Sequence, residues 1–502
     1  MMNMRRILSA ALAVMLSLSL SACSAKKTPR IASNGEEKIT LPIREANAPP
    51  APYGDKKDSE VYRASIYYAS ADGSVSVPST RVLWLNSQSS VERRIAEELM
   101  KVPGGDALAV VPRGSRIASV EAAGEIVSVN VLPTAVMSDM EVKTLAEAMS
   151  RTLFELSGVE YVNLFLYGRA ASFNGLPVGL IGKTTDVSAL VDESIHFAET
   201  ENASVSRRAA VYFPSVDETC VIPMETTLSY APDDPAEAVL RALGNEPHAR
   251  GVLSGVPACE NMFERKSHYE VMPSGDRILN IHLTNDAFDA LEASGHDRHM
   301  YLASIVLSLT SFLSDTDGVL ITIGGKTITE VPLSGGTMRA FSAGIMKRDD
   351  FAAYIGENVP LYFSGEDDML HREFRALPIS ASDSARARIL SLMSGPMDDE
   401  NRAVFPDGVR ASDILGVQIS GSVLSVNLSS NVYRLAQGFT QSEEELFVYG
   451  LVNTLSDLRG VSGVRLYFEG ATGSVLTQKV YLEGVILKNP GRVYQIVNSA
   501  SN

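Results

Sequence analysis

The sequence is poor in cysteine and tryptophan and has no excess of positive charge. Its 502 residues include 3 cysteines and one tryptophan, and 44 basic against 60 acidic residues give a net charge of −16. A surface of that sign repels phosphate backbones, and no basic stripe offsets it, so we expect no nucleic-acid partner. Aromatic residues make up only 7% of the chain, which argues against a carbohydrate-stacking surface. With 45% hydrophobic residues the composition is globular, and the length predicts about three domains.

The first residues have the pattern of an export and anchoring segment. Arg5 and Arg6 precede an apolar run, residues 7–20, which is shorter than the roughly 20 residues of a bilayer span. Leu-Ser-Ala then leads to Cys23, which resembles the lipobox of bacterial lipoproteins at all four positions. The sequence therefore predicts a signal peptide over residues 1–22, lipidation of Cys23 and an extracytoplasmic location on the cell membrane. The alternatives are a plain signal peptide with a chance cysteine or a buried hydrophobic helix.

A tether and two more cysteines follow the lipobox. Residues 23–60 mix prolines with small and polar side chains, which is typical of a flexible tether that reaches on the order of 30 Å. Cys220 and Cys259 remain once Cys23 is used. Export permits a disulfide between them, and two unrelated buried thiols are the alternative.

Beyond the tether the chain repeats one unit three times. Each copy opens with an apolar and aromatic strand, which is centred on Tyr67, Tyr212 and Tyr362. A second strand, an amphipathic helix, two alternating strands, a longer apolar helix and a closing hairpin follow. The hydroxyl–x–x–Glu pattern of a capping box marks several helix starts: Ser89 with Glu92, Ser138 with Glu141, and Thr440 with Glu443.

The repeat predicts an α+β fold with three tandem domains, each a mostly antiparallel sheet covered by two helices. The predicted domains span residues 61–182, 209–336 and 359–490. Residues 183–208 and 337–358 lack the pattern and are predicted to be linkers, and residues 491–502 a C-terminal tail.

The unit resembles the GerMN domain family, the module of GerM-like lipoproteins of sporulation and spore germination. The third copy matches the family pattern best, with Leu361-Tyr362-Phe363, Gly395-Pro396, Pro406-Asp407-Gly408, Val426-Asn427-Leu428 and Gly463-Val464. The second copy keeps Val211-Tyr212-Phe213 and Gly325-Lys326 but lacks the Gly-Pro, and the first copy is the most degraded.

The resemblance implies a fold akin to the ring-building modules of envelope machines. It also implies a role in sporulation or germination, in which the protein supports a multi-protein envelope complex through protein–protein contacts. Members usually carry two such domains, so the third is a departure from the family. The same module occurs in lipoproteins that modulate membrane sensor kinases, whose additional β-propeller this chain lacks.

No catalytic set recurs in register among the copies. His282 aligns with Asn130 and Asn427, which indicates a polar strand position rather than a general base. His296 and His299 stand three residues apart, yet no cluster of Cys or carboxylate residues accompanies them, so we expect no metal site.

Two further motifs have structural explanations. Gly324-Gly325 precedes Lys326, but Leu320 stands where a phosphate-binding loop needs glycine, so a hairpin turn is predicted. The acidic run 443–445 lies at a predicted helix start, where the helix dipole favours carboxylates. We therefore predict neither catalytic residues nor a cofactor.

The leading functional hypothesis is a non-enzymatic, lipid-anchored scaffold that contacts other envelope proteins. Its partners would be the membrane, through the anchor, and proteins of a sporulation or germination complex. The alternative is a ligand-binding or sensor lipoprotein that modulates a membrane kinase or a germinant receptor. An enzyme acting on the cell wall is a third hypothesis, which the lack of an in-register catalytic set disfavours.

Overall fold

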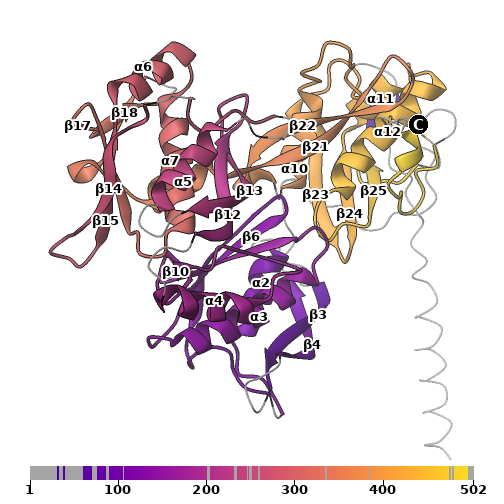
Figure 1. The fold of residues 1–502 in the computed structure, drawn as a ribbon. Helices are drawn as coiled ribbons and strands as arrows, with labels where there is room; N and C mark the ends of the chain where they lie inside the picture. The colour runs from indigo at the N-terminus through magenta and orange to yellow at the C-terminus, as the bar shows by residue number, and fades with distance from the viewer. Residues whose placement is uncertain are drawn as a thin grey trace, which may run out of the picture.

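The structure is a computed structural model. It describes residues 31–32, 38–39, 60–70, 76–85, 90–105, 107–199, 204–230, 235–245, 247, 251–257, 261–333, 336–382, 384–473, 476 and 480–495 (Figure 1). The predicted signal peptide, Cys23 and Cys259 lie outside these residues. In the predicted tether the structure describes Glu60 and one short antiparallel pair, β1 (Ile31–Ala32) with β2 (Lys38–Ile39).

The elements of each copy follow the predicted order. The first copy contains β3 (Glu60–Ala69), β4 (Ser76–Leu85), α2 (Val91–Leu99), β5 (Arg116–Ala123), β6 (Ile126–Leu132), α3 (Asp139–Phe154), β7 (Tyr161–Leu166), β8 (Arg169–Ala170), β9 (Ser172–Phe173), β10 (Leu176–Pro177), β11 (Leu180–Gly182) and α4 (Val187–Glu199). The second contains β12 (Val205–Pro214), β13 (Val221–Tyr230), α5 (Pro235–Gly244), β14 (Phe263–Val271), β15 (Arg277–Leu283), α6 (Asn285–Ser294), α7 (Arg298–Phe312), β16 (Gly318–Ile323), β17 (Lys326–Thr327), β18 (Glu330–Pro332), β19 (Met338–Ala340), η1 (Ser342–Gly344) and β20 (Ile345–Met346).

The third copy is preceded by a short helical connection. That connection consists of α8 (Arg348–Phe351) and η2 (Ala352–Tyr354). The copy itself contains β21 (Gly356–Ser364), β22 (Leu370–Pro378), α9 (Ile379–Ser382), α10 (Ala385–Met393), η3 (Ala411–Asp413), β23 (Ile414–Ser420), β24 (Val423–Leu428), α11 (Ser430–Ala436), α12 (Gln441–Ser456), β25 (Gly463–Phe468) and η4 (Pro490–Arg492).

Each copy has two separate β layers. The first two strands form a long antiparallel ribbon: β3 with β4, β12 with β13, and β21 with β22. The next three strands form a sheet in which the first pair is antiparallel and the second pair is parallel: β5-β6-β7, β14-β15-β16 and β23-β24-β25. The parallel pair follows from the long helix that joins its strands, because such a crossover returns the chain in the same direction. The α+β fold with three repeats is thus confirmed, with one parallel pair in each sheet.

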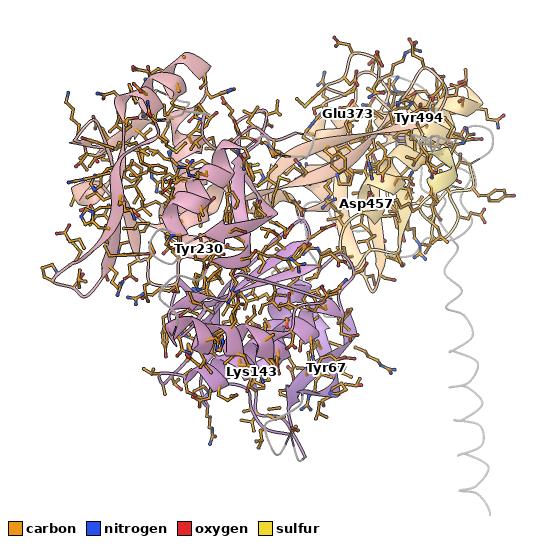
Figure 2. The ribbon with its side chains drawn as sticks, viewed as in Figure 1. Tyr67, Lys143, Tyr230, Glu373, Asp457 and Tyr494 are labelled. Carbon is orange, nitrogen blue, oxygen red and sulfur yellow. The ribbon has the colours of Figure 1, made fainter. Side chains whose placement is uncertain are left out.

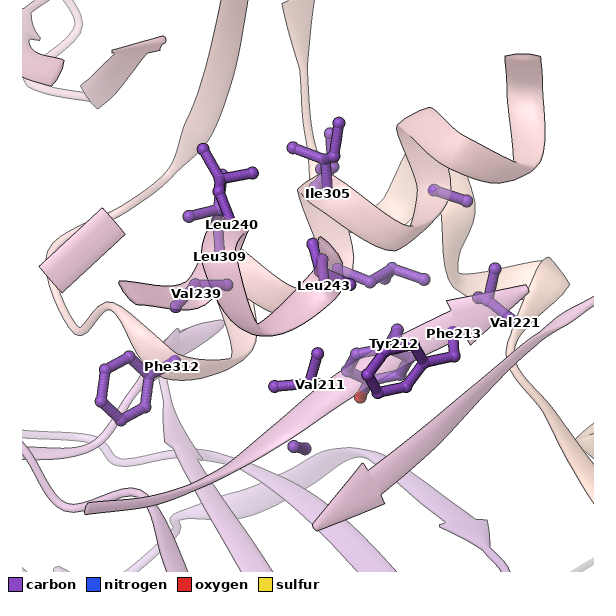
Figure 3. Packing of buried hydrophobic residues seen from close by; sticks show 14 of the residues in the cluster. Val211, Tyr212, Phe213, Val221, Val239, Leu240, Leu243, Ile305, Leu309 and Phe312 are labelled. Carbon is purple, nitrogen blue, oxygen red and sulfur yellow. The ribbon is translucent and has the colours of Figure 1, made fainter. Parts of the chain in front are cut away.

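The long helix of each copy lies between the ribbon and the sheet. Figure 3 shows the ribbon side of this packing in the second copy, where Ile305, Leu309 and Phe312 of α7 and Leu240 of α5 lie above β12. Every residue of α7 from His299 to Phe312 is buried, because other elements surround this helix in addition to its own sheet and ribbon. A helix that is apolar on all sides is expected in such a place.

The prediction of a linker over residues 183–208 is wrong, because this segment contains α4. Val187 and Val191 of α4 are buried in the core of the first copy, and the helix packs on α3. Its acidic residues Asp192 and Glu193 lie on the exposed face. An amphipathic helix with an acidic outer face therefore accounts for the composition that had indicated a solvated linker.

The second predicted linker and the start of the predicted tail also belong to folded units. Residues 337–358 contain β20, which pairs with β16 and extends the sheet of the second copy. Within the predicted tail 491–502, Val493 forms a bridge with Leu370 of β22. Tyr494 stacks on His371 with ring centroids 4.7 Å apart. These short pairings depend on distant strands, so local sequence patterns do not reveal them.

Helix capping agrees with the sequence at two of the three predicted boxes. Ser138 with Glu141 and Thr440 with Glu443 form reciprocal capping boxes at α3 and α12. At α2 the prediction was wrong by one residue, because Ser90 accepts the hydrogen bond from the backbone of Arg93. Glu92 is consequently free of a capping role and is 4% exposed.

The three copies pack as three lobes around a common junction (Figure 1). Buried residues of the first and third copies, including Ile126, Leu180 and Ala376, join one hydrophobic cluster with the second copy. The first copy also touches the third through hydrogen bonds and an ion pair. The repeats are therefore a packed assembly and not separate beads.

Candidate functional site

One tyrosine position is built in the same way in all three copies. The tyrosine lies in the middle of the opening strand, and its backbone N–H donates to a hydroxyl on the long helix. The pairs are Tyr67 with Thr152 at 2.9 Å, Tyr212 with Ser308 at 2.8 Å, and Tyr362 with Thr454 at 3.3 Å. This bond fixes the long helix to the ribbon, and we call the surrounding side chains the tyrosine site of each domain.

In the first and third domains the tyrosine hydroxyl meets the residue three positions after that Thr, which is the C-cap of the long helix. Tyr67 donates to Glu155 at 2.8 Å, and Tyr362 donates to Asp457 at 2.9 Å (both tyrosine sites appear in Figure 2, through Tyr67 and Asp457). In the second domain this helix residue is Ser311.

Each domain also has a basic residue at an equivalent position. It lies two positions after a residue that pairs with the last strand of the three-stranded sheet. The pairs in register are Ile181 with Val162, Met346 with Val319, and Ile486 with Val464. The basic residues that follow are Lys183, Arg348 and Lys488. The sequence analysis missed this position. The basic residue follows a short pairing segment whose separation from the tyrosine differs in each copy, and Lys183 and Arg348 fall in the predicted linkers.

The three basic residues have different partners. Lys488 pairs with Asp457, and its Nζ lies 5.5 Å from the centre of the Tyr362 ring. Arg348 donates to the Tyr212 hydroxyl at 3.1 Å and to Ser311. Lys183 instead pairs with Glu160 at 2.6 Å, and both side chains are 42% exposed.

The electrostatics of the tyrosine sites oppose chemical reactivity. Burial and Asp457 raise the pKa of Tyr362. The pKa of Tyr67 is raised by the hydrogen bond from the Tyr67 hydroxyl to Glu155 and, to a smaller extent, by burial. Burial favours a neutral Lys488, but Asp457 outweighs it and raises the pKa of that lysine. A tyrosine base or a lysine nucleophile needs the opposite shift. These groups stay protonated at neutral pH and are suited to binding.

Arg348 carries the contact between the first and second domains. Its side chain is 12% exposed and pairs with Glu121 of β5, which is 17% exposed. Its guanidinium also lies 4.9 Å from the centre of the Phe165 ring on β7. Burial disfavours the charge, but Glu121 and the Tyr212 hydroxyl outweigh burial and raise the pKa of Arg348. The tyrosine site of the second domain is thereby closed by the sheet face of the first.

Further polar contacts surround this junction. Asn163 donates to the backbone oxygen of Ser311 at 3.2 Å, and Arg169 binds Asp317 through two hydrogen bonds of 2.7 and 2.8 Å. A polar cleft of about 370 Å³ lies beside Arg348 and is lined from both domains, with Asn130 on one side and Asp317 on the other.

The first domain reaches the third through the turn after β5. The backbone N–H of Gly124 donates to Glu357 at 2.8 Å, and Glu357 also binds Arg388 at 3.1 Å. Arg459 pairs with Glu92 at 2.8 Å and donates to the Gly124 carbonyl. Glu92 therefore has an interdomain role that its sequence position at a helix start did not indicate.

We expect the Arg459→Met variant to loosen the contact between the first and third domains. The change leaves Glu92, whose side chain is 5% exposed, without its cation, at a cost of about 2 kcal/mol. Native-state hydrogen exchange of the α2 amides should become faster. The control is Arg402→Met, because the Arg402–Glu366 pair is 70% and 78% exposed and should contribute little. Equal exchange in both variants would contradict the role of Arg459.

His282 occupies the polar strand position that the repeat predicts. Asn130 accepts from the backbone of Gly168 at 3.0 Å, and Asn427 accepts from Gly470 at 2.9 Å, so both hold the hairpin turn that follows the last sheet strand. His282 lies 2.7 Å from the Thr322 hydroxyl and stacks on His268.

Gly324-Gly325 forms the hairpin turn that was predicted. Their φ angles are 52° and 76°, and the same left-handed pair recurs at Tyr167-Gly168 and Glu469-Gly470. This is the conformation of a tight hairpin and not of a phosphate-binding loop.

The two histidines considered as metal ligands have unrelated surroundings. His296 pairs with Glu218 at 2.7 Å, whereas His299 is 1% exposed and contacts the rings of Phe351 and Tyr354. Within the described ranges no three His, Cys, Asp or Glu residues are grouped so that they could hold a metal ion.

The acidic run 443–445 has three separate structural roles. Glu443 caps α12, and the backbone and side chain of Thr440 lower its pKa. Glu444 is fully buried and accepts from the backbone of Val480 at 3.1 Å. Glu445 pairs with Arg492. The three carboxylates are therefore engaged with different partners.

The cysteine pairing stays a prediction. Cys220 is buried, and burial raises the pKa of its thiol to about 11. It packs against Gly356, where a Cβ would meet its sulfur at 2.3 Å. Cys259 lies outside the described residues, so a disulfide between the two cysteines stays a prediction.

Among the helices that the structure describes, none combines the length and the apolar character needed to cross a membrane. No curated protein shows significant similarity to the chain. Among solved structures, the tandem GerMN domains of the sporulation protein GerM from Bacillus subtilis match at 18% identity with a TM-score of 0.24, covering 58% of this chain and 99% of that one. The first GerMN domain of that protein matches at 20% identity with a TM-score of 0.19, covering 22% of this chain and 87% of that one.

The family comparison covers most of the folded chain. The family described as "Germane: Sporulation and spore germination" matches three times, over residues 65–171, 210–329 and 360–474. The three matches fall on the three structural repeats and together span more than half of the sequence. The chain therefore belongs to the Germane family of sporulation and spore germination proteins, as a member with three GerMN-like domains.

Proposed function

We propose that the protein is a lipid-anchored extracytoplasmic scaffold that supports a sporulation or germination complex through protein–protein contacts. Membership in the Germane family supports the cellular process. The lipobox ending in Cys23 supports the anchor, and the cell membrane is its site of attachment.

The observation that carries the proposal is the use of the second tyrosine site as a joint between domains. Tyr212, Ser311 and Arg348 together hold the sheet face of the first domain. The first domain presents its own tyrosine site, with Tyr67 partly exposed and Glu155 exposed. A surface that joins domains within the chain is thus repeated at a place where another protein can reach it.

A non-enzymatic role fits the electrostatics. In the third tyrosine site the raised pKa values of Tyr362 and Lys488 hold both groups in their unreactive, protonated forms. The acid and base pair that cell-wall hydrolysis requires would show divergent shifts instead.

The host organism provides the decisive test. Deletion of the gene should impair sporulation or germination when the two are scored separately, and the wild-type gene should restore the defect. A Cys23→Ala variant should fail to restore it, because the protein would be released from the membrane. Normal sporulation and normal germination in the deletion strain would refute the proposal.

A second experiment addresses the contact surface. A photocrosslinking amino acid at position 67 should capture an envelope protein in sporulating cells, because Tyr67 lies at the first tyrosine site. The control position is Val136, which is 91% exposed but distant from the tyrosine in sequence and outside the repeated set. Capture of the same protein with equal yield from both positions would contradict a specific surface at Tyr67.

The alternative function, a ligand-binding or sensor lipoprotein that modulates a membrane kinase or germinant receptor, is favoured by one observation. The second domain contains an apolar cavity of about 490 Å³, which is within the size range of ligand sites.

A further inference from the structure

The second and third domains contain the same additional helix, buried to different extents. α6 follows β15 and α11 follows β24, and the residue before each helix is a hydroxyl residue, Thr284 or Ser429. Counting from that residue, the apolar positions of the two helices coincide. The pairs are Ala287 with Val432, Phe288 with Tyr433, and Leu291 with Ala436.

In the third domain this helix is closed onto the core. Val432 and Ala436 are fully buried, and Tyr433 is 6% exposed. In the second domain no residue of α6 is buried, although Phe288 and Leu291 face the core side. α6 is therefore packed less deeply than its counterpart α11.

The space beneath α6 is a cavity of about 490 Å³. Its walls come from α5, α6, α7, the ends of β15 and β16, and the segment from β17 to β18. The lining is mainly aliphatic and includes Leu240, Leu283, Leu302, Ile305, Ile321 and Ile323. The cavity is partly open to solvent, so its aliphatic lining lacks van der Waals partners on that side. A bound apolar group would restore these contacts.

The charged groups of the cavity lie at its margin. Arg298 pairs with Glu292 of α6, and its guanidinium lies 5.3 Å from the centre of the Phe288 ring, so it links α6 to α7. Lys326 and Glu330 are exposed residues of the segment opposite α6. The aliphatic walls suit a hydrocarbon chain, and the polar margin suits a head group that remains in water.

We propose that this cavity binds a single acyl chain, with its polar head beside Lys326 and Arg298. The site goes beyond the scaffold function and depends only on the second domain. Because the lining is aliphatic, we expect affinity to depend on the length of the hydrocarbon chain and not on polar groups along it. The source of the chain is either a free fatty acid or a membrane lipid, and the two share the chemistry of a hydrocarbon tail with an anionic head.

The test uses the purified chain from Ser24 to Asn502, which retains all three domains. Displacement of a fluorescent dansyl-undecanoate probe is measured with saturated fatty acids of eight to sixteen carbons, with lysophosphatidylglycerol and with phosphatidylglycerol vesicles. Affinity should rise by about fourfold for each added methylene until the cavity is filled, and then level off. Displacement by the fatty acids alone identifies a free acid as the source. Displacement that also occurs with the lysolipid and vesicles identifies a lipid.

Two variants on α6 form a matched pair. Ala287→Trp places an indole in the cavity and should weaken dodecanoate binding by at least tenfold. Ala293→Trp adds the same side chain at an exposed residue of the same helix that does not line the cavity, and should leave binding unchanged. Circular dichroism verifies that both variants fold. Equal affinity of the two variants would show that the probe binds elsewhere and would overturn the proposal.

A third variant tests the head group. Lys326→Glu should weaken dodecanoate several-fold while leaving the uncharged dodecanol unaffected, because only the acid carries a charge at the margin. The chain-length series on the unaltered protein requires no variant, and affinity independent of chain length would refute an acyl-chain site on its own. Binding is measured on isolated protein, so it is decided separately from the phenotype that tests the scaffold function.

Discussion

We expect the Arg348→Met variant to lose about 3–5 kcal/mol of unfolding free energy in the transition that includes the second domain. Methionine keeps most of the length of the side chain but removes the charge that compensates Glu121, and a buried carboxylate left alone is costly. The change also removes the donors to the Tyr212 hydroxyl and to Ser311. Urea denaturation at pH 7 measures the effect.

Two further variants test whether the loss of stability comes from breaking the ion pair between Arg348 and Glu121. Lys183→Met removes the residue at the same position of the first domain, where the pair with Glu160 is exposed, and should cost at most about 1 kcal/mol. The double variant Arg348→Met, Glu121→Leu removes both charges and should recover much of the loss. If Arg348→Met were no more destabilising than Lys183→Met, the junction would not depend on this arginine.

The second large effect concerns acid stability and His299. Burial, with a contribution from Arg339, lowers the pKa of His299 to about 4. The unfolded chain has an ordinary histidine pKa near 6.5, so between these values the unfolded state binds the proton and the folded state does not. Stability should therefore fall as the pH drops from about 6.5 to about 4, by about 3 kcal/mol in total, and this group should add nothing further below that.

His299→Phe should remove this part of the acid sensitivity. Neither ring nitrogen of His299 has a hydrogen-bond partner among the residues that the structure describes. The ring centroid lies 4.6 Å from that of Tyr354 and 5.2 Å from that of Phe351, so an apolar ring suits the site. At pH 7 the variant should be as stable as the wild type or more stable. Tyr354→Phe keeps the ring contact and the histidine, and should retain the acid sensitivity. Parallel pH profiles for wild type and His299→Phe would contradict the assignment.

The repeated strands and long helices were predictable because they obey simple periodicities. Alternation around Asn130, His282 and Asn427 placed these residues at one polar position, and the structure confirms the shared register. The capping boxes at Ser138 and Thr440 also follow from local spacing.

The basic position of the tyrosine sites was not predictable from local patterns. Arg348 follows β20, which has two residues and no periodicity of its own, and it pairs with Glu121, 227 residues earlier in the chain. A polar residue in such a segment resembles a linker residue until the partner domain is placed. The same holds for Glu92, whose distance from a serine imitated a capping box while its actual partner is Arg459.

The late position of β20 has a consequence for how the chain matures. During synthesis the amino-terminal domain emerges first, but the strand that extends the second sheet and the arginine that binds Glu121 emerge only with residues 345–348. The surface that contains Phe165 and Asn163 is therefore exposed to solvent until the second repeat has been synthesised. Such an interval exposes nascent chains to aggregation, so this surface is where chaperones would protect the growing chain most.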